Sequence, residues 1–320
     1  MASEFELIRR HFTLPTRNTR LGVGDDAALL MPRPGMELVV TNDMLVSGTH
    51  FFADTDPLDL GWKTLAVNVS DIAAMGAEPR WAFLAIALPA ADEAWVAALA
   101  RGFAECTERF GIDLAGGDTT RGPLTLSVTL IGETTAGSAV RRDGAQAGDD
   151  IWVTGTPGRA ALGLAHLRGE LTLPAEAADL CLAALQRPQP RVDAGQALRH
   201  IATAMLDVSD GLLGDLGHIL ERSGVGASIA LDLLPPALDS DHGVGDDRLH
   251  HATLRGGDDY ELLFTAAPVH RDNITHLSSS LGLPFTRIGE ITGDTGTITL
   301  IDPQGNATPT RALGYDHFRA

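Results

Sequence analysis

LAGGDTTRG, at residues 114–122, is the stretch around which the fold is predicted to be organised. The apolar residues up to Ala115 predict the end of a buried strand. Gly116 and Gly117 are expected to break that strand, which places Asp118 at its tip. Glycines at a strand end let the backbone approach a ligand closely. An aspartate there can hold a metal ion, and the neighbouring hydroxyl and guanidinium groups suit phosphate oxygens. The alternative is a polar turn between two strands.

The residues around this stretch predict an N-terminal half in which helices cover one face of a mixed sheet. Hydrophobic periodicity and helix start and stop signals place its elements. In chain order they are a helix at 4–12, strands within 22–31, a strand at 38–40, a helix from about 57 to 75, a strand at 80–89, a helix at 92–111, a strand ending at 115 and a strand at 124–133.

A Gly-, Ala- and charge-rich stretch at 134–150 predicts the link to a second domain, which begins with a strand at 150–155. Further helices and strands follow, and residues 239–251 are expected to form a loop rich in Asp and His. We therefore predict an α/β (α+β) protein of two domains. Residues 1–136 would form the N-terminal domain, and residues 137–320 a C-terminal α/β domain.

Composition excludes several classes of protein. A net charge of −18 argues against nucleic acid as a partner, because phosphate backbones need a basic face. No run approaches the roughly 18 apolar residues of a membrane span, and the N-terminus MASEFELIRRHF lacks a signal-peptide core, so we expect no membrane association. The two cysteines, Cys106 and Cys181, have no metal-ligand spacing, and a cytoplasmic location is expected.

Acidic residues recur near the ends of the predicted elements of the first half. Asp26 follows a short strand, and Asp43 follows the strand at 38–40. Thr64, Asn68 and Asp71 form a narrow polar stripe on an otherwise apolar helix. A buried carboxylate costs several kcal/mol unless it is paired or metal-bound, so the stripe predicts a site. The alternative is a stripe that faces solvent.

The second half contains a comparable junction at LDVSDGL. Asp207 lies in a strand, and Ser209 and Asp210 precede a helix whose free N–H groups can meet a phosphate. The alternative is that Ser209 and Asp210 only cap the helix. The helix start after VTGTPG, at 153–158, is weaker evidence for an anion site. The triplet Gly-Asp-Asp at 257–259 recurs elsewhere in the chain, and at least two of the copies are expected to be ordinary turns.

The chemistry of these groups favours Mg²⁺. Hard oxygen ligands without histidine or cysteine are typical of magnesium rather than zinc sites. The sequence contains no Walker A motif, no HExxH, no nucleophilic serine elbow and no CxxC. Several Mg²⁺ ions held by carboxylates suit phosphoryl transfer, in which the protein positions groups and neutralises charge.

Eight motifs, in chain order, closely resemble those of the thiamine-monophosphate kinase family: GVGDDAALL, TNDMLVSGTHF, KTLAVNVSDIAAMGAEP, GGDTTRGP, VTGTPG, LDVSDGL, GGDDYEL and GYDHF. That family is grouped with aminoimidazole-ribonucleotide synthetase and selenophosphate synthetase. The resemblance implies direct transfer of the γ-phosphoryl group of ATP to thiamine monophosphate, with several Mg²⁺ ions. It also implies that residues 1–136 form the metal- and nucleotide-binding domain, and that the protein is a homodimer that pairs through the sheet of this domain.

The resemblance further implies roles for individual residues, with Asp71 and Asp210 as the catalytic pair. Asn42 stands where a hydroxyl residue is usual, and Asp258 stands where glutamate is usual. The remaining roles are a Mg²⁺ shell of Asp26, Thr41, Asn42, Asp43, Asp71, Asp118, Asp207 and Asp210; ATP contacts from Gly117, Asp118, Arg142 and Ser209; and substrate contacts from His50, Asp258 and Tyr315.

Two other functions compete with this interpretation. Selenophosphate synthetase resembles this chain but needs a reactive cysteine or selenocysteine near the N-terminus, and here the first cysteine is Cys106. The second rival is an acidic metal-binding or interaction protein in which the aspartates are solvated turns. ATP consumption that depends on thiamine monophosphate would separate these functions.

Overall fold

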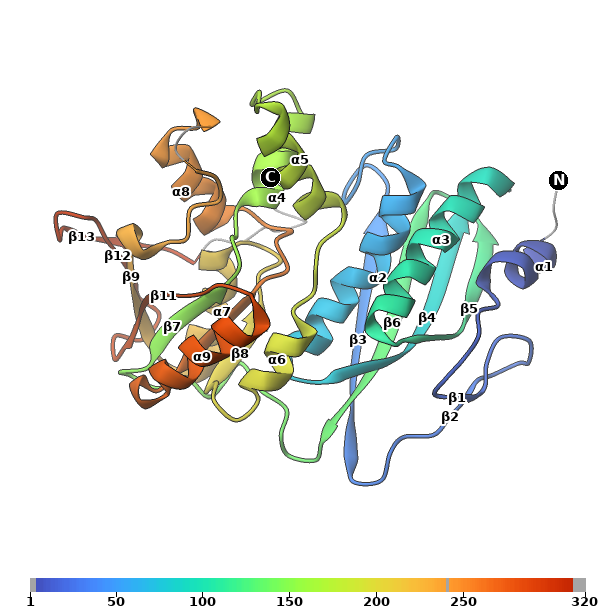
Figure 1. Ribbon diagram of the computed structural model, residues 1–320, viewed down its shortest axis with the longest axis horizontal. Helices are drawn as coiled ribbons and strands as arrows, with labels where there is room; N and C mark the ends of the chain where they lie inside the picture. The colour runs from blue at the N-terminus through green and yellow to red at the C-terminus, as the bar shows by residue number, and fades with distance from the viewer. Residues whose placement is uncertain (1–3, 240–241, 313–320) are drawn as a thin grey trace. The chain divides into compact units, whose positions relative to one another are not determined.

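The computed structural model describes residues 4–239 and 242–312. The chain divides into two compact units. The first unit contains the chain up to Ala73 and also Ala77–Ser138. The second unit contains the short segment Ala74–Gly76 and the chain from Ala139 onwards. Both units combine helices with mixed sheets, so the predicted α/β class is confirmed (Figure 1). Within the described ranges, no helix combines the length and apolar character that crossing a membrane requires.

The first unit is built on a four-stranded sheet with the strand order β3-β6-β4-β5. Only β4 and β5 pair in parallel. Helices α2 and α3 lie side by side over one face of the sheet, as the order of elements predicts (Figure 1). The elements are α1 (Glu4–Leu7), η1 (Ile8–Phe12), β1 (Thr19–Leu21), β2 (Leu29–Leu30), β3 (Met36–Val46), α2 (Pro57–Ala74), β4 (Glu78–Leu88), α3 (Glu93–Phe110), β5 (Asp113–Arg121) and β6 (Thr125–Thr135).

Two glycines allow α2 and α3 to pack with their backbones in contact. A Cβ atom on Gly61 would lie 2.0 Å from the carbonyl oxygen of Leu99, and one on Gly102 would lie 1.8 Å from that of Leu58. The close crossing fixes α2 over the sheet. Helix α3 begins as its sequence predicts, because the carboxylate of Asp92 accepts the first free N–H groups of the helix.

Two strands of this unit are longer than predicted. Strand β3 runs from Met36 to Val46, so Asp43 lies inside the strand rather than after its end. Strand β5 continues through Gly116 and Gly117, and Asp118 lies within an edge strand rather than at a tip. The glycines do not break β5, because Gly117 adopts a φ of 152° that keeps the chain paired with β4.

The second unit contains a seven-stranded sheet with the order β13-β12-β9-β11-β7-β10-β8, in which only β12 and β9 pair in parallel. Its elements are β7 (Asp150–Thr154), α4 (Arg159–Leu167), α5 (Ala175–Gln186), α6 (Val192–Leu198), β8 (Ala204–Asp207), α7 (Leu212–Ser223), β9 (Gly226–Ala230), η2 (Leu231–Leu233), α8 (Asp246–Arg255), β10 (Leu262–Ala266), η4 (Pro268–His270), α9 (Arg271–Leu281), β11 (Phe285–Thr292), β12 (Ile298–Ile301) and β13 (Ala307–Thr310).

Both faces of this sheet are buried around β7, β10 and the edge strand β8, because successive residues of these strands enter different cores. Leu206 of β8 packs with α7, whereas its neighbour Met205 packs with Leu198 of α6 and Ile274 of α9. A third core joins α4, α5 and α8. Asp207 therefore ends a strand whose direction is fixed by packing on both sides.

The loop predicted at 239–251 is partly wrong, because helix α8 begins at Asp246. Leu249 and Ala252 are buried on the side of α8 that packs against α4 and α5. The run of Asp and His residues concealed this short apolar face. Helix α8 leads directly into the Gly-Gly-Asp-Asp stretch, which begins at Gly256.

Candidate functional site

Two hydrogen bonds join β3 to α2 at the polar stripe of the first unit. The hydroxyl of Thr41 donates to Oδ2 of Asp71, and the N–H of Asp43 donates to Oδ1 of Asn68 at 3.0 Å. Asn68 and Thr64 are 0% and 2% exposed, so the alternative of a solvent-facing stripe is wrong for these two residues. Thr41 and Asp43 share the helix-covered face of the strand, because side chains alternate along β3. The structure thus brings Thr41, Asp43 and Asp71 to one side of the sheet.

Asn42 points to the opposite face. Its side-chain nitrogen donates to the carbonyl oxygen of Val128 at 2.9 Å and to the hydroxyl of Thr129 at 2.9 Å. The amide of Asn42 is therefore committed to β6, and the structure does not bring it to the side of Thr41 and Asp71.

His50 lies in the turn that follows β3. The N–H of Val46 donates to its Nδ1 at 3.0 Å. Nδ1 must therefore be unprotonated, and the neutral ring carries its proton on Nε2, where it can donate to a ligand. The last residue of β3 thus sets both the orientation and the tautomer of this predicted substrate contact.

Gly117 and Asp118 line a pocket on the other edge of the sheet. Its empty space is about 340 Å³, open solvent included, and its lining is otherwise mostly apolar, with Phe12 of η1 and Leu84 of β4. Gly117 is in register with Asp43 across β4 and β6. Three strand spacings separate them, roughly 14 Å. Within one chain, Asp118 and Asp43 therefore occupy different parts of the unit.

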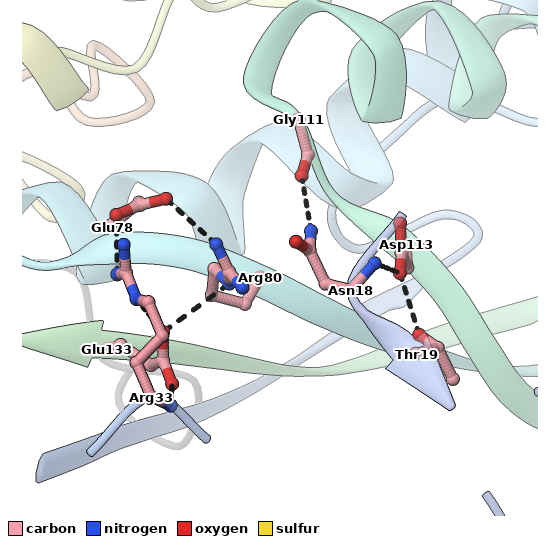
Figure 2. A network of polar contacts seen from close by, with 8 residues as sticks. All are labelled: Asn18, Thr19, Arg33, Glu78, Arg80, Gly111, Asp113 and Glu133. Atoms are coloured by element: carbon pink, nitrogen blue, oxygen red, sulfur yellow. Dashed lines mark hydrogen bonds and ion pairs between the residues drawn. The ribbon is translucent and has the colours of Figure 1, made fainter. Parts of the chain in front are cut away.

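Asp26 lies in the exposed loop between β1 and β2, and a buried carboxylate secures the entry to this loop. Asp113, which is 1% exposed, accepts the N–H of Arg17 at 2.8 Å and the hydroxyl of Thr19 at 2.8 Å. Asn18 adds its own N–H and a side-chain bond to Gly111 (Figure 2). The start of β5 thus holds the chain that leads into the Asp26 loop.

A second carboxylate network secures the entry to β3 (Figure 2). Glu133, which is fully buried, accepts the backbone N–H and Nε of Arg33, both at 2.7 Å. Glu78 accepts from Arg33 at 2.6 Å and from Arg80 at 3.1 Å. Burial alone would raise the pKa of Glu78, but the two guanidinium groups hold that pKa below its usual value. These contacts fix the start of the strand that carries Thr41 and Asp43.

In the second unit, β8 ends at Asp207 and α7 begins at Leu212. The N-cap residue of α7 is Gly211, which has no side chain. Neither Ser209 nor Asp210 therefore occupies the N-cap position. Their side chains belong to a connection of four residues between a buried strand and a helix.

Asp215 holds this connection from inside α7. Its Oδ2 accepts the N–H groups of Ser209 and Asp210, both at 3.1 Å. Burial raises the pKa of Asp215 to about 7. Nothing in the sequence pattern had distinguished Asp215 from other helix residues.

The Gly-Gly-Asp-Asp stretch lies against the same connection. The N–H of Asp258 donates to the carbonyl oxygen of Ser209 at 2.9 Å, and the N–H of Tyr260 donates to that of Val208 at 2.9 Å. Asp258 and Tyr260 have φ angles of 67° and 53°, in the left-handed region that side chains disfavour. The structure thus brings Asp258 next to Ser209, although 49 positions separate them in the sequence.

The start of α4 is already occupied by a carboxylate of this chain. Asp259 accepts the N–H of Gly158 at 2.6 Å and that of Ala160 at 3.2 Å, and burial raises its pKa well above the usual value. The expectation that the VTGTPG turn binds a phosphate is therefore not supported. Glu261 accepts a bidentate pair from Arg191 at 2.6 and 2.7 Å, which fixes the other end of the stretch.

The donors present suit Mg²⁺ without forming a closed cage. Over residues 4–239 and 242–312, no group of three or more His, Cys, Asp or Glu side chains is arranged to hold a metal ion. Thr41, Asp43 and Asp71 nevertheless supply hard oxygen donors only. Mg²⁺ is usually bound through one or two carboxylates together with waters and substrate phosphates, which fits this open arrangement. Tyr315, a predicted substrate contact, lies outside the described residues.

Comparison with known proteins assigns the chain to a family. Residues 24–134 match the family of the AIR synthase related protein, N-terminal domain, and residues 146–301 match that of its C-terminal domain. Thiamine-monophosphate kinase of Escherichia coli O157:H7 is 45% identical over 322 residues, covering 98% of both chains. That of Salmonella typhimurium is 43% identical, again over 98% of both chains. The chain belongs to the thiamine-monophosphate kinase family.

Solved structures of the thiamine-monophosphate kinase family have the same fold. The crystal structure of the enzyme from Stenotrophomonas maltophilia K279a matches with a TM-score of 0.87 at 49% identity, covering 96% of this chain and 98% of that one. AaThiL complexed with AMPPCP and TMP matches with a TM-score of 0.78 at 30% identity, covering 92% of each chain. Hydrogenase maturation protein HypE, at 19% identity and a TM-score of 0.79, shares the fold alone.

Proposed function

We propose that this chain transfers the γ-phosphoryl group of ATP to thiamine monophosphate, giving thiamine diphosphate and ADP. The observation that carries the proposal is identity of 43–45% to thiamine-monophosphate kinases over nearly the whole chain. The related AaThiL has been solved with AMPPCP and TMP together, which supports ATP and thiamine monophosphate as the two substrates.

The reaction needs no protein base. A phosphate monoester has a second pKa near about 6, so it is largely a dianion at neutral pH. One of its oxygens attacks the γ-phosphorus in line, and the bond from that phosphorus to the β,γ-bridging oxygen breaks as ADP leaves. Bound Mg²⁺ supplies charge screening between the two polyanions. What remains for the protein is to position the phosphates.

We assign the first unit to metal and nucleotide binding, in line with the predicted role of residues 1–136. Thr41, Asp43 and Asp71 are proposed to hold one part of the metal shell, since they share one side of the sheet. Gly117 and Asp118 are proposed to contact the nucleotide at the pocket on the other edge. Because several ions are proposed, Asp118 serves a different ion from Asp43. Asp26 completes the proposed metal shell from its exposed loop.

The second unit, within residues 137–320, is proposed to contribute Asp207 and Asp210 to metal binding and Arg142 and Ser209 to ATP. The support is the junction between β8 and α7, where Asp215 accepts the N–H groups of Ser209 and Asp210 shortly after Asp207. Asp258 is proposed to contact thiamine monophosphate, together with His50 and Tyr315. Its position beside Ser209 supports this role, because the acceptor must lie close to the nucleotide phosphates.

The function is tested by ATP consumption with Mg²⁺ in three parallel reactions, with thiamine monophosphate, with thiamine and without an acceptor. We expect turnover only with the monophosphate, because thiamine lacks the dianionic nucleophile. Omission of Mg²⁺ should abolish the reaction. Equal ATP consumption in all three reactions would contradict the proposal and favour another ATP-using member of the fold. In the productive reaction, inversion at a chiral γ-phosphate is expected, whereas retention would indicate a phospho-enzyme.

We propose that the chain forms a homodimer through the open face of the first sheet. Leu38, Val40 and Met44 alternate along β3 on the face away from α2 and are 48%, 60% and 53% exposed. Three large apolar side chains exposed on one face of a strand, interrupted only by Asn42, are typical of an interaction surface. The family resemblance supports a second copy of this chain as the partner.

Substitution at this face should dissociate the dimer. We expect the wild type to sediment at twice the mass of the chain and Val40→Glu to shift towards the monomer, because the substitution places an unpaired charge in an apolar contact. Val269→Glu is the matched control, since Val269 is 81% exposed in the second unit. A monomeric wild type, or a Val40→Glu variant that stays dimeric, would contradict the proposal.

A cytoplasmic location is also proposed. Cys106 of α3 and Cys181 of α5 are both buried and form no disulfide, which is the usual state of cysteines in a reducing compartment. Burial raises the pKa of Cys181 to about 11, so neither its position nor its ionisation suits a reactive thiol.

A further inference from the structure

The connection between β8 and α7 places three proposed ligand contacts, Asp207, Ser209 and Asp210, within four residues of the chain. Such a connection has two rotatable backbone angles per residue and no regular hydrogen bonding of its own. Its shape must therefore be imposed by contacts from outside it. Those contacts decide where the hydroxyl of Ser209 and the carboxylate of Asp210 point.

A single side-chain atom supplies the contact on the α7 side. Oδ2 of Asp215 accepts both the N–H of Ser209 and the N–H of Asp210 at 3.1 Å. Asp215 is 4% exposed, and its own N–H donates to the carbonyl oxygen of Gly211 at 2.9 Å, within the first turn of α7. The acceptor is therefore mounted on a rigid, buried element and cannot follow the connection if the connection moves.

The Gly-Gly-Asp-Asp stretch supplies the contact on the other side. The carbonyl oxygen of Ser209 accepts the N–H of Asp258, and a Cβ atom on Gly257 would lie 2.4 Å from that same oxygen. The hydroxyl of Tyr260 donates to Oδ1 of Asp258 at 3.0 Å, which steadies the opposing residue. Ser209 is thus held through its N–H by Asp215 and through its carbonyl by Asp258.

We propose that Asp215 is a positioning residue for phosphoryl transfer: its Oδ2 fixes the backbone of Ser209 and Asp210, and thereby aims their side chains at the phosphates. The inference rests on the proposed function. It concerns the acceptor oxygen and not the charge, because a neutral amide oxygen at the same place can accept both N–H groups. Catalytic groups displaced by about 1 Å can lose roughly 10²-fold in rate, so a remote-looking aspartate can control turnover.

Two substitutions separate the acceptor from the charge. Asp215→Asn keeps an acceptor oxygen with the same reach, and we expect kcat to stay within about threefold of wild type. Asp215→Leu has nearly the same shape, suits a buried site and removes the acceptor. We expect it to lower kcat by about 10- to 100-fold, with a smaller change in KM for thiamine monophosphate. Should Asp215→Leu fail to fold, Asp215→Ala takes its place with the same expectation.

The matched control is Asp149→Leu. Asp149 is another buried aspartate of the second unit, and it accepts the N–H of Gln146 at 3.0 Å and the hydroxyl of Thr203 at 2.7 Å. It adjoins Asp150, which pairs with Ala266, whereas Asp207 pairs with Leu262 at the opposite end of β10. Loss of this acceptor should reduce stability without lowering kcat in the folded protein.

Hydrogen exchange at residues 207–212, measured without substrates, provides a readout that does not depend on the reaction. We expect faster exchange of the Ser209 and Asp210 amides in Asp215→Leu, and wild-type exchange in Asp215→Asn. A folded Asp215→Leu protein with wild-type kcat would overturn the proposal, as would an Asp215→Asn protein as slow as Asp215→Leu. If the wild type is inactive but Asp215→Leu still exchanges faster than Asp215→Asn, the proposed function is wrong. The conclusion that Asp215 fixes the backbone of the connection would then still stand.

Discussion

Asp71→Ala and Asp210→Ala are each expected to lower kcat by about 10²-fold or more, because each carboxylate is proposed to hold metal on the phosphates in the transition state. Asp71 already accepts the hydroxyl of Thr41, and Asp210 is held at its N–H by Asp215. Both carboxylates are therefore placed before substrates bind. Loss of either removes one ligand from the proposed metal shell and leaves phosphate charge less well compensated.

Steady-state kinetics over a range of Mg²⁺ concentrations measures the effect. We expect high Mg²⁺ to restore only part of the lost rate, since the ion would still lack a fixed ligand. Asp272→Ala is the control, because Asp272 is an exposed carboxylate in the first turn of α9, and its loss should leave kcat unchanged. Near-normal rates in both Asp71→Ala and Asp210→Ala would remove the metal assignment altogether.

Gly117→Ala is expected to have the largest effect of any single methyl group in the proposed nucleotide site. The added Cβ would lie 1.9 Å from the carbonyl oxygen of Leu84, and φ at this position is +152°. Neither the added Cβ nor the carbonyl oxygen of Leu84 can move away at a low cost in energy, because both belong to paired strands. We expect a loss of about 3 kcal/mol or more in the free energy of unfolding. Displacement of the adjacent Asp118 should also raise KM for ATP.

Chemical denaturation of the variant, followed by nucleotide titration of whatever protein folds, measures both consequences. Gly122→Ala is the matched control, at the residue that directly follows the same strand. Its added Cβ would approach only the methyl group of Ala87, at 3.4 Å. We expect Gly122→Ala to cost less than about 1 kcal/mol and to keep the wild-type KM for ATP. Equal stability of the two variants would show that β5 adjusts its backbone more easily than the described geometry implies.

The first unit could largely be predicted from its sequence, because α2, β4, α3 and β6 each carry a clear hydrophobic period. The errors occurred where polar residues stand inside strands. Thr41-Asn42-Asp43 was interpreted as the end of a strand, since polar runs usually mark ends. In the structure Thr41 and Asp43 instead find partners on α2, and Asn42 bonds to β6. Polar residues inside a strand are stable only when residues distant in the sequence bind them, and the local sequence pattern does not reveal these partners.

The sequence predicts the residues that are proposed to contact ligands, but it does not predict the buried residues that hold them in position. Asp207, Ser209, Asp210 and Asp258 were identified from motifs, and the structure brings the two segments that carry them into contact. The sequence does not predict the role of Asp215, because this side chain accepts backbone N–H groups of the preceding connection, and backbone groups are the same at every position. Asp113 was missed for the same reason, since its partners lie more than 90 positions earlier in the chain. Buried carboxylates that serve backbone amides are recognised only from coordinates.

Each of the four residues 258–261 makes a different contact. Asp258 meets the connection before α7, Asp259 occupies the start of α4, Tyr260 returns to Asp258, and Glu261 binds Arg191. Deleting or inserting one residue here would shift the register, so that each side chain would face the partner of its neighbour. Because Asp258 is proposed to contact thiamine monophosphate, we expect exchange of its side chain to change the preference for the acceptor, whereas shortening or lengthening the segment that carries it should disrupt the site.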